Sequence, residues 1–321
     1  MSAPSITSLP LDACAGLHGG DFLSIRQLTR DSLTGLLTLA VDVRRAPTRY
    51  GSALIGKTVA TIFDKPSLRT RVSFHVAACQ LGAHVIDLHP GEIGLRGRES
   101  LDDIARTLEG MVDALVIRTS AHDVVERLAD VASIPVINGL TDDSHPCQAL
   151  ADYLTIHDVK QRLTGVHLAF VGDGNNVANS LIEGAALLGV GMVIASPAGY
   201  EPHPELLEWA QRHEAVKGTA CRVVTSPESA VTGADVVYTD TWISMGQEGD
   251  AEERLRAFRG FQVTRELFDR AAPDAIFMHC LPAHRGEEVA AEVIDSPQSV
   301  VFAQARNRLH SEKALLLALL R

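Results

Sequence analysis

Apolar and polar positions alternate along the chain in two periods, one typical of strands and the other of helices. Residues 58–63 are β-branched and apolar, which predicts a buried strand. After a short polar stretch, Val72, Val76 and Cys79 recur at the spacing of one helix face, so we expect them to be buried. Similar strand and helix patterns follow, and the alternation begins again at Val166. Such alternation indicates parallel sheets covered by helices, and we expect an α/β fold with two doubly wound domains, each a mostly parallel sheet flanked by helices.

The same patterns predict the other elements. Strands are predicted at residues 83–88, 114–118, 135–137, 167–172, 192–195, 221–224, 236–238 and 275–278. Helices are predicted at residues 32–45 (capped by Asp31 or Ser32), 68–79, 101–110, 122–131, 146–158, 177–188, 204–213, 251–258 and 264–271, and from about 287 and 308. Glycine and proline mark residues 89–99 as a loop.

The length of the chain favours two domains. At 321 residues it exceeds the size at which one core usually keeps growing. We expect the first domain at residues 1–145, completed by a C-terminal helix at about 307–321, and the second at residues 146–306. Pro146 suits the first position of a helix that links them.

Composition narrows the classes of partner. The net charge is −11 and aromatic residues make up 5%, so we expect no nucleic-acid surface. The cysteines number five, are scattered and form no C-x-x-C pair, which is typical of reduced thiols in a cytoplasmic protein. The first residues lack the pattern of a secretory signal, and no apolar run reaches membrane-spanning length, so no membrane association is expected.

The segment after the first strand has the chemistry of a phosphate site. Ser67 is a suitable N-cap for a helix that begins at Leu68, and Arg69 and Thr70 fall in its first turn. A helix N-terminus attracts anions, and a guanidinium with two hydroxyl groups strengthens that attraction. The alternative is an ordinary capped helix with exposed arginines.

Other polar side chains follow predicted strands, where open α/β sheets bind ligands. The donors Arg118 and His145 belong to the first domain and suit an anion or a polarised carbonyl group. Asn176, Asp240 and Ser244 belong to the second and suit an amino acid. This division predicts an anionic substrate on one domain and an amino-acid-like substrate on the other.

Structural roles are the alternatives at these positions. Arg118 could lie on the surface, His145 could cap a turn, Asp240 could shape a turn, and Cys280 could be a small buried residue. His279 and Cys280 are neighbours on a strand end and should point apart, so we expect no metal site there. The glycines at residues 172–174 resemble a dinucleotide fingerprint, but its third glycine is replaced by Val177, which argues against NAD.

Several motifs together resemble one known family. They are Ser67-Leu68-Arg69-Thr70-Arg71, His145-Pro146-Cys147-Gln148 and His279-Cys280-Leu281-Pro282, with Gly172-Asp173-Gly174-Asn175-Asn176 and Asp240-Thr241-Trp242-Ile243-Ser244-Met245-Gly246. Their types and order resemble the aspartate/ornithine carbamoyltransferase family, and the last two motifs resemble its ornithine-specific members. The resemblance extends from about residue 20 to the end of the chain.

The resemblance implies transfer of a carbamoyl group from carbamoyl phosphate to L-ornithine, giving L-citrulline and phosphate without a metal or cofactor. The first domain would bind carbamoyl phosphate and the second ornithine. It implies carbamoyl-phosphate contacts from Ser67, Leu68, Arg69, Thr70, Arg118, His145, Gln148, Cys280, Leu281 and Arg308. It implies ornithine contacts from Asn176, Asp240, Ser244 and Met245, and catalytic roles for Arg118, His145, Asp240 and Cys280. A homotrimer, or a multiple of trimers, is the implied assembly.

The chain departs from the family pattern at four places: Leu68, where threonine is commoner, His75 and Arg306, where acidic residues are common, and the loop at residues 89–99. Other functions therefore stay open. The acceptor could be aspartate, an N-acylated ornithine or a diamine, or the protein could be a catalytically silent regulator that binds small molecules.

Overall fold

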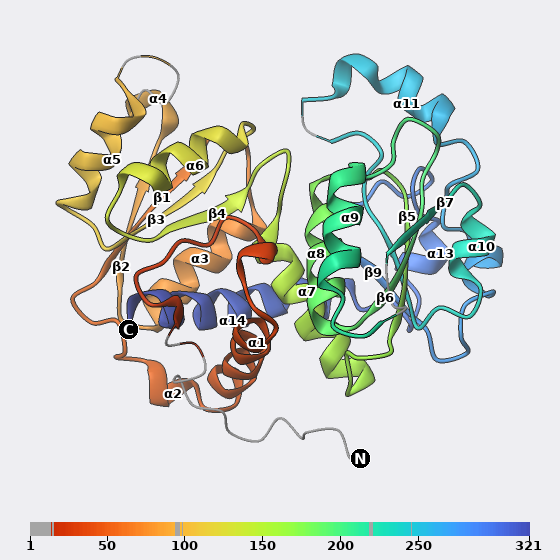
Figure 1. Ribbon diagram of the computed structural model, residues 1–321, viewed down its shortest axis with the longest axis horizontal. Coiled ribbons are helices and arrows are strands. Elements are labelled where there is room, and N and C mark those ends of the chain that lie inside the picture. The colour runs from red at the N-terminus through yellow and green to blue at the C-terminus, as the bar shows by residue number, and fades with distance from the viewer. Residues whose placement is uncertain (1–13, 15, 94–96, 98, 218–220, 245) are drawn as a thin grey trace. The chain divides into compact units, whose positions relative to one another are not determined.

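The computed structural model describes residues 14, 16–93, 97, 99–217, 221–244 and 246–321, and it divides the chain into two α/β units (Figure 1). The first unit contains the described residues up to Leu154 together with Arg306–Arg321, and the second is Thr155–Ala305. Each unit has a parallel sheet with helices packed on it, as the sequence pattern predicted.

The first unit has a four-stranded sheet in the order β2-β1-β3-β4. Its strands are β1 (Thr58–Phe63), β2 (His84–Leu88), β3 (Ala114–Arg118) and β4 (Val136–Leu140). Its helices are α1 (Arg30–Arg45), α2 (Pro47–Tyr50), α3 (Arg69–Gln80), α4 (Pro90–Ile93), α5 (Leu101–Glu109) and α6 (His122–Val131), with the first part of α7 (Pro146–Lys160) and most of α14 (Val301–Leu320). A short 3₁₀ helix, Ile25–Gln27, precedes α1.

The second unit has a five-stranded sheet in the order β7-β6-β5-β8-β9. Its strands are β5 (His167–Val171), β6 (Gly191–Ala195), β7 (Arg222–Val224), β8 (Val236–Thr239) and β9 (Ile276–His279). Its helices are α8 (Asn176–Leu188), α9 (Pro204–His213), α10 (Pro227–Val231), α11 (Ala251–Ala257), α12 (Arg265–Phe268) and α13 (Ala291–Ile294), with a 3₁₀ turn at Glu248–Asp250.

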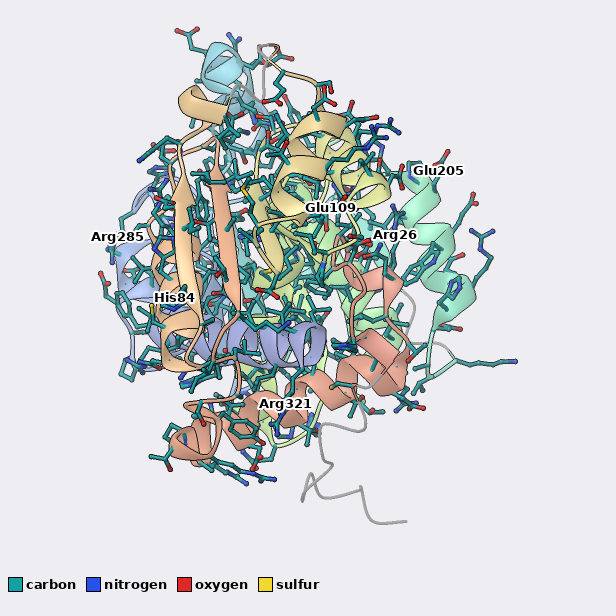
Figure 2. The ribbon with its side chains drawn as sticks, turned by 90° about the vertical axis from the view of Figure 1, so that its left-hand side faces the viewer. Arg26, His84, Glu109, Glu205, Arg285 and Arg321 are labelled. Carbon is teal, nitrogen blue, oxygen red and sulfur yellow. The ribbon has the colours of Figure 1, made fainter. Side chains whose placement is uncertain are left out.

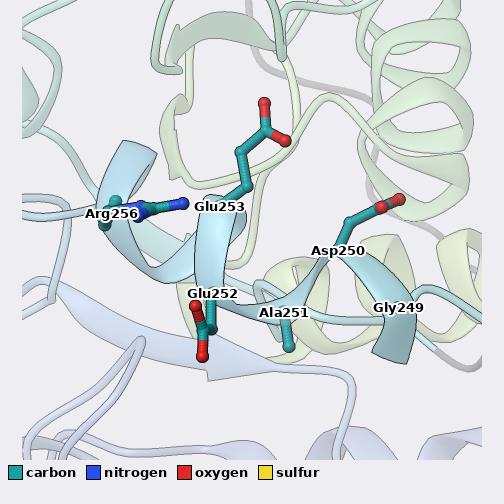
Figure 3. Close-up of a pocket in the computed structure, with 6 residues that line it drawn as sticks. All are labelled: Gly249, Asp250, Ala251, Glu252, Glu253 and Arg256. Atoms are coloured by element: carbon teal, nitrogen blue, oxygen red, sulfur yellow. The ribbon is translucent and has the colours of Figure 1, made fainter.

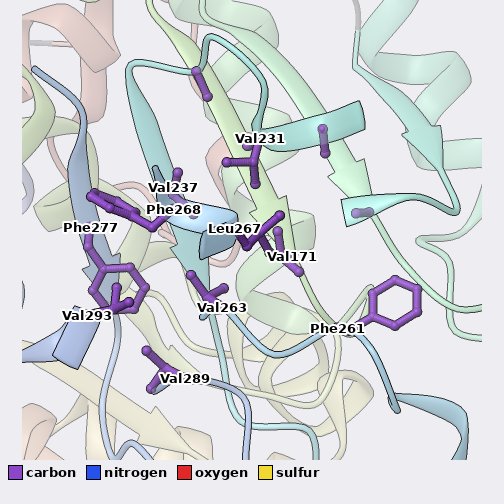
Figure 4. Packing of buried hydrophobic residues seen from close by; sticks show 14 of the residues in the cluster. Val171, Val231, Val237, Phe261, Val263, Leu267, Phe268, Phe277, Val289 and Val293 are labelled. Atoms are coloured by element: carbon purple, nitrogen blue, oxygen red, sulfur yellow. The ribbon is translucent and has the colours of Figure 1, made fainter. Parts of the chain in front are cut away.

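Each unit has its own apolar core. In the first unit, strand residues such as Ile62 and Leu115 pack with Val125 and Leu128 of α6. In the second, Val171 and Val237 of the sheet pack with the aromatic rings of Phe268 and Phe277 and with Val289 (Figure 4). Charged side chains lie outside these cores, as the exposed Arg26, His84 and Arg321 of the first unit illustrate (Figure 2). Burial of the apolar faces fixes where each sheet edge presents its polar residues.

The prediction for the buried face of α3 was wrong. Val72 is 51% exposed and Cys79 is also exposed, whereas Phe74, Ala77 and Ala78 are completely buried. The two faces lie about half a turn apart, on opposite sides of a helix with 3.6 residues per turn. Two of the buried positions are alanines, whose small side chains give a weaker hydrophobic signal than the valines on which the prediction relied.

Several predicted boundaries also needed correction. Helix α3 begins at Arg69 with Leu68 as its N-cap, and no side chain caps it, so Ser67 is not the cap. Helix α1 is capped by Thr29, whose hydroxyl accepts the backbone N–H of Ser32, rather than by Asp31 or Ser32. The predicted loop at 89–99 contains α4, and the C-terminal helix starts at Val301 rather than near Arg308. The helices at 122–131 and 204–213 have the predicted bounds.

Candidate active site

The parallel pairing of β1 and β3 places two predicted groups at one edge of the first sheet. Phe63, at the end of β1, is in register with Arg118 at the end of β3, and the Asp64 N–H donates to the Arg118 carbonyl at 2.8 Å. Arg118 is 8% exposed. The loop that leads into α3 therefore starts beside Arg118, as the rule for strand ends predicts.

The buried guanidinium of Arg308 connects two other predicted residues of the first unit. Arg308 of α14 donates to the Thr70 hydroxyl (Nη2 to Oγ1, 3.0 Å) and to the Gln148 amide (Nη1 to Oε1, 2.7 Å). It also donates through Nε and Nη2 to one carboxylate oxygen of Glu312, at 3.0 and 2.7 Å. Gln148 in turn donates to Asp152 at 2.8 Å. Residues from three distant segments therefore form one hydrogen-bonded group.

Glu312 was not among the residues predicted from the sequence. It stands four residues after Arg308 on a helix, and this spacing with opposite charges was a signal that could have revealed the pair. Both side chains are almost completely buried, and burial raises the pKa of Glu312 to about 7 although Arg308 lowers it.

His145 lies in a cationic environment. Burial lowers its pKa well below the ordinary value, and the positive charges of Arg308, Arg118 and Arg69 lower it further. The imidazole is therefore neutral at physiological pH, so it can donate one hydrogen bond without adding a further charge. Three cations around a neutral donor suit an anionic ligand with a carbonyl group.

The other residues predicted near phosphate lie at the start of α3. Thr70 is 1% exposed, Arg69 is partly buried, and Leu68 is 73% exposed. Ser67, partly buried, precedes them in the loop. Cys280 and Leu281, which the resemblance also assigned to carbamoyl phosphate, belong to the second unit.

The second unit brings Asp240 and Cys280 together. β8 and β9 pair with Thr239 opposite His279, so the residues that follow them are neighbours. The Cys280 thiol donates to Asp240 Oδ1 at 2.8 Å, and the Thr241 backbone N–H donates to the same oxygen at 2.8 Å. Asp240 is 5% exposed, so its carboxylate is held by hydrogen bonds rather than by water.

Asn175, which was not among the predicted residues, contacts Asp240. Its Nδ2 donates to Asp240 Oδ2 at 2.7 Å, while its Oδ1 accepts the backbone N–H groups of Val177 and Ala178 as the N-cap of α8. Asn176 is the first residue of that helix and is partly buried. The preference of asparagine for N-caps was a signal that could have pointed to Asn175.

A second buried ion pair supports the loop after Asp240. Arg254 of α11 pairs with Asp173 and donates from Nε to the Trp242 carbonyl at 2.5 Å. Its guanidinium also stands 4.9 Å above the Tyr200 ring. Burial raises the pKa of Asp173 to about 6, with Arg254 opposing the shift and Asp240 adding to it. Arg254 was not predicted as part of this site.

Two further predictions concern the same loop. Ser244 is partly buried, and its backbone N–H donates to Gln247 Oε1 at 3.0 Å. The predicted ornithine residue Met245 lies outside the described residues. The nearby pocket on α11 is lined by Gly249, Asp250, Ala251, Glu252, Glu253 and Arg256, none of which was predicted for the site (Figure 3).

The expectation that His279 and Cys280 point apart was wrong. Side-chain donor atoms of Asp240, His279 and Cys280 lie within 4.8 Å of one another. Strand alternation ends with β9 at His279, and Leu281 has a positive φ of 58°, which turns the chain. Both ring nitrogens of His279 already form hydrogen bonds, to Leu281 N–H at 2.8 Å and to Glu288 at 3.1 Å, which leaves neither for a metal ion.

Comparison with known proteins gives the family. Residues 20–158 match the carbamoyl-P binding domain of aspartate/ornithine carbamoyltransferase, and residues 164–319 match its Asp/Orn binding domain. The chain therefore belongs to the aspartate/ornithine carbamoyltransferase family. Within the described residues, no helix is long and apolar enough to span a membrane.

Relatives that are named ornithine carbamoyltransferases are similar over almost their whole length. The ornithine carbamoyltransferase of Thermococcus kodakarensis is 50% identical over 94% of this chain and 96% of its own, and that of Anoxybacillus flavithermus is 49% identical over 97% and 99%. The solved ornithine carbamoyltransferase of Pyrococcus furiosus superposes with a TM-score of 0.91 at 49% identity, covering 95% of this chain and 98% of its own. The enzyme of Thermus thermophilus gives a TM-score of 0.85 at 43% identity, covering 98% and 100%.

Proposed function

We propose that this protein transfers the carbamoyl group of carbamoyl phosphate to the side-chain amine of L-ornithine, forming L-citrulline and phosphate in arginine biosynthesis. The observation that carries the proposal is the Asp240–Cys280 contact, because it puts a carboxylate and a thiol at adjacent strand ends of the Asp/Orn binding domain. Relatives that are about 50% identical and are named ornithine carbamoyltransferases support the choice of acceptor.

The first unit holds the donor substrate in this proposal. Ser67, the Leu68 backbone N–H, Arg69 and Thr70 bind the phosphate group at the N-terminus of α3, where the helix dipole favours an anion. Arg308 supports them, since its guanidinium already binds the Thr70 hydroxyl. Positive charge at this position stabilises phosphate both in the substrate and as the leaving group.

The carbamoyl group is polarised by neighbouring donors. Arg118, His145 and Thr70 donate to its carbonyl oxygen, which becomes negative as the amine attacks, and Gln148 binds its amide. Because the pKa of His145 is lowered, the ring is a neutral donor, and the arginines supply the charge. One donor of this kind is worth about 3–4 kcal/mol of activation free energy.

The second unit holds the acceptor. Asp240, Asn176, Ser244 and Met245 bind ornithine, whose attacking nitrogen must first lose a proton, since a free amine of this type has a pKa near 10. Asp240 orients that amine, while Cys280 and Leu281 lie beside both substrates. The new N–C bond forms as the C–O bond to phosphate breaks, and the amine proton leaves through Asp240 or Cys280.

Assembly and location complete the proposal. A homotrimer, or a multiple of trimers, in the cytoplasm is the form we expect. Sedimentation equilibrium of the purified protein tests the assembly, and a mass of one or two chains would rule out the trimer.

The activity is tested by measuring citrulline formation from carbamoyl phosphate with a panel of acceptors. We expect turnover with L-ornithine and none above background with L-aspartate, N-acetylornithine or putrescine. Turnover with one of these and not with ornithine would assign a different acceptor. Binding of carbamoyl phosphate without turnover of any acceptor would indicate a silent binding protein.

A further inference from the structure

Glu288 is a charged side chain with no exposed surface in the second unit. Its Oε1 accepts two hydrogen bonds, from His279 Nε2 at 3.1 Å and from the His284 backbone N–H at 2.6 Å. Burial acts to raise its pKa, but these hydrogen bonds outweigh burial and hold the pKa below the ordinary value. A buried carboxylate is costly unless its hydrogen bonds compensate, so a residue of this kind at this position requires a reason.

His279 connects Glu288, through hydrogen bonds, to the backbone that follows β9. Its Nδ1 accepts the Leu281 backbone N–H at 2.8 Å, so the single ring proton lies on Nε2 and points to Glu288. The His279 backbone N–H donates to Gln304 Oε1 at 3.1 Å, and Gln304 Nε2 donates to the Tyr238 hydroxyl at 3.0 Å. The ring and its backbone are therefore held from separate directions.

The Leu281 N–H lies immediately after the thiol of the proposed site. Leu281 has a φ of 58°, in the left-handed region that side chains with a branched body rarely adopt, so an external contact must help to keep it there. Cys280 stands between Leu281 and His279, and its Sγ is 2.8 Å from Asp240 Oδ1. The orientation of the thiol thus depends on the turn that His279 holds.

We propose that Glu288 is a positioning residue that, through His279 and the Leu281 N–H, holds the Cys280 thiol against Asp240. Without it the imidazole can rotate, the turn relaxes, and Asp240 loses the thiol hydrogen bond that fixes the direction of its carboxylate. The expected effect on turnover rests on the proposed carbamoyl transfer. The expected effect on the orientation and reactivity of the Cys280 thiol does not depend on that function.

Alkylation of the thiols by iodoacetamide tests the positioning directly. The full-length protein is labelled over time, and the Cys280 peptide is quantified against the Cys79 peptide, whose exposed thiol in the other unit is an internal reference. We expect Glu288→Ala to raise this Cys280/Cys79 ratio about tenfold, the effect of losing one buried hydrogen bond. Glu288→Gln keeps an acceptor oxygen for both N–H donors and should keep the wild-type ratio. Glu287→Gln removes one negative charge at the adjacent position, leaves Glu288 and His279 unchanged, and is the matched control.

Kinetics give a second readout. We expect Glu288→Ala to lower kcat about tenfold, because the Asp240 carboxylate loses the thiol hydrogen bond that fixes its direction. Glu288→Gln should have a kcat close to that of the wild type, because it keeps the acceptor oxygen. If the negative charge itself were needed, Glu288→Gln would be as slow as Glu288→Ala.

Substitutions of His279 keep the proposal testable if Glu288→Ala fails to fold. Asparagine can place an oxygen near the position of Nδ1 and accept the Leu281 N–H, whereas glutamine reaches towards Glu288 and leaves Leu281 without its acceptor. We expect His279→Asn to keep a lower Cys280/Cys79 ratio than His279→Gln. Equal ratios for these two variants, or an unchanged ratio in a folded Glu288→Ala, would overturn the proposal. If the wild type forms no citrulline, the proposed function is wrong. The Cys280/Cys79 labelling ratio then still tests whether Glu288 positions the Cys280 thiol.

Discussion

Replacing Arg308 with methionine removes the cation from the buried Arg308–Glu312 pair while keeping an unbranched side chain in its place. Glu312 has no exposed surface, and Arg308 forms two hydrogen bonds to its Oε1. In the wild type, burial raises the pKa of Glu312 from an ordinary 4.5 to about 7, and the charge of Arg308 limits the shift. Without Arg308 the pKa rises further, so the folded variant keeps Glu312 protonated.

The sign and size of the effect follow from proton linkage. In the wild type, protonation of this carboxyl in the folded state contributes fully to the free energy of unfolding below the ordinary pKa of the group. That contribution is lost as the pH rises through about 7, and above this value the carboxyl causes no further change in stability. In Arg308→Met the folded state still holds one proton that the unfolded chain has released, so stability falls by about 1.4 kcal/mol per pH unit. Between about pH 7 and pH 8.5 the variant should lose about 2 kcal/mol more than the wild type.

Chemical denaturation followed by far-UV circular dichroism measures this at several pH values and one protein concentration. The double variant Arg308→Met/Glu312→Gln is the control, since it has no carboxyl to titrate and should show no added slope. His145 does not interfere, because its lowered pKa and its ordinary value both lie below this range. An Arg308→Met profile as flat as that of the double variant would refute the reasoning.

Three other substitutions test separate parts of the protein. Arg69→Ala should lower citrulline formation at least about 100-fold with an unchanged circular dichroism spectrum, because it removes a cation from the phosphate site. Arg254→Met should raise the KM for ornithine and destabilise the second unit by about 3–5 kcal/mol in denaturation, because it leaves Asp173 buried without its partner. Phe277→Ala should destabilise the protein by about 3–5 kcal/mol, because its ring is completely buried in the core shown in Figure 4.

Each of these has its own contradicting result. Near-normal turnover in Arg69→Ala would exclude the proposed phosphate site. Asp173→Asn in the Arg254→Met background should recover part of the lost stability, and no recovery would mean that the ion pair is not the cause. A decrease of less than about 1 kcal/mol in the free energy of unfolding of Phe277→Ala would show that the surrounding side chains move to fill the cavity left by the ring.

Local pattern was sufficient for much of the fold. The β-branched run of β1, the helical spacing of α6 and α9 and the strand–helix alternation predicted two parallel α/β units, and the structure confirms them. The rule that ligands bind at the carboxyl ends of parallel strands selects Arg118 and Asp240 on sequence alone. These inferences succeed because burial on a strand or helix repeats with the period of that element.

The contacts between distant segments could not be read in this way. Arg308 meets Thr70 and Gln148 across 238 and 160 residues of sequence, and Asn175 reaches Asp240 across 65. Such contacts depend on strand order and on the direction of each side chain at an element's end, where the periodic pattern stops.

The sequence by itself thus determined the class of fold, the family resemblance and most residues proposed for the two substrates. Only the tertiary structure decided which face of α3 is buried, that Asn175 contacts Asp240, and that Glu288 is hydrogen-bonded to His279, the residue before Cys280. The physical reason is that hydropathy reports whether a residue is buried, whereas a hydrogen bond depends on which atoms the folded backbone brings within about 3 Å of each other.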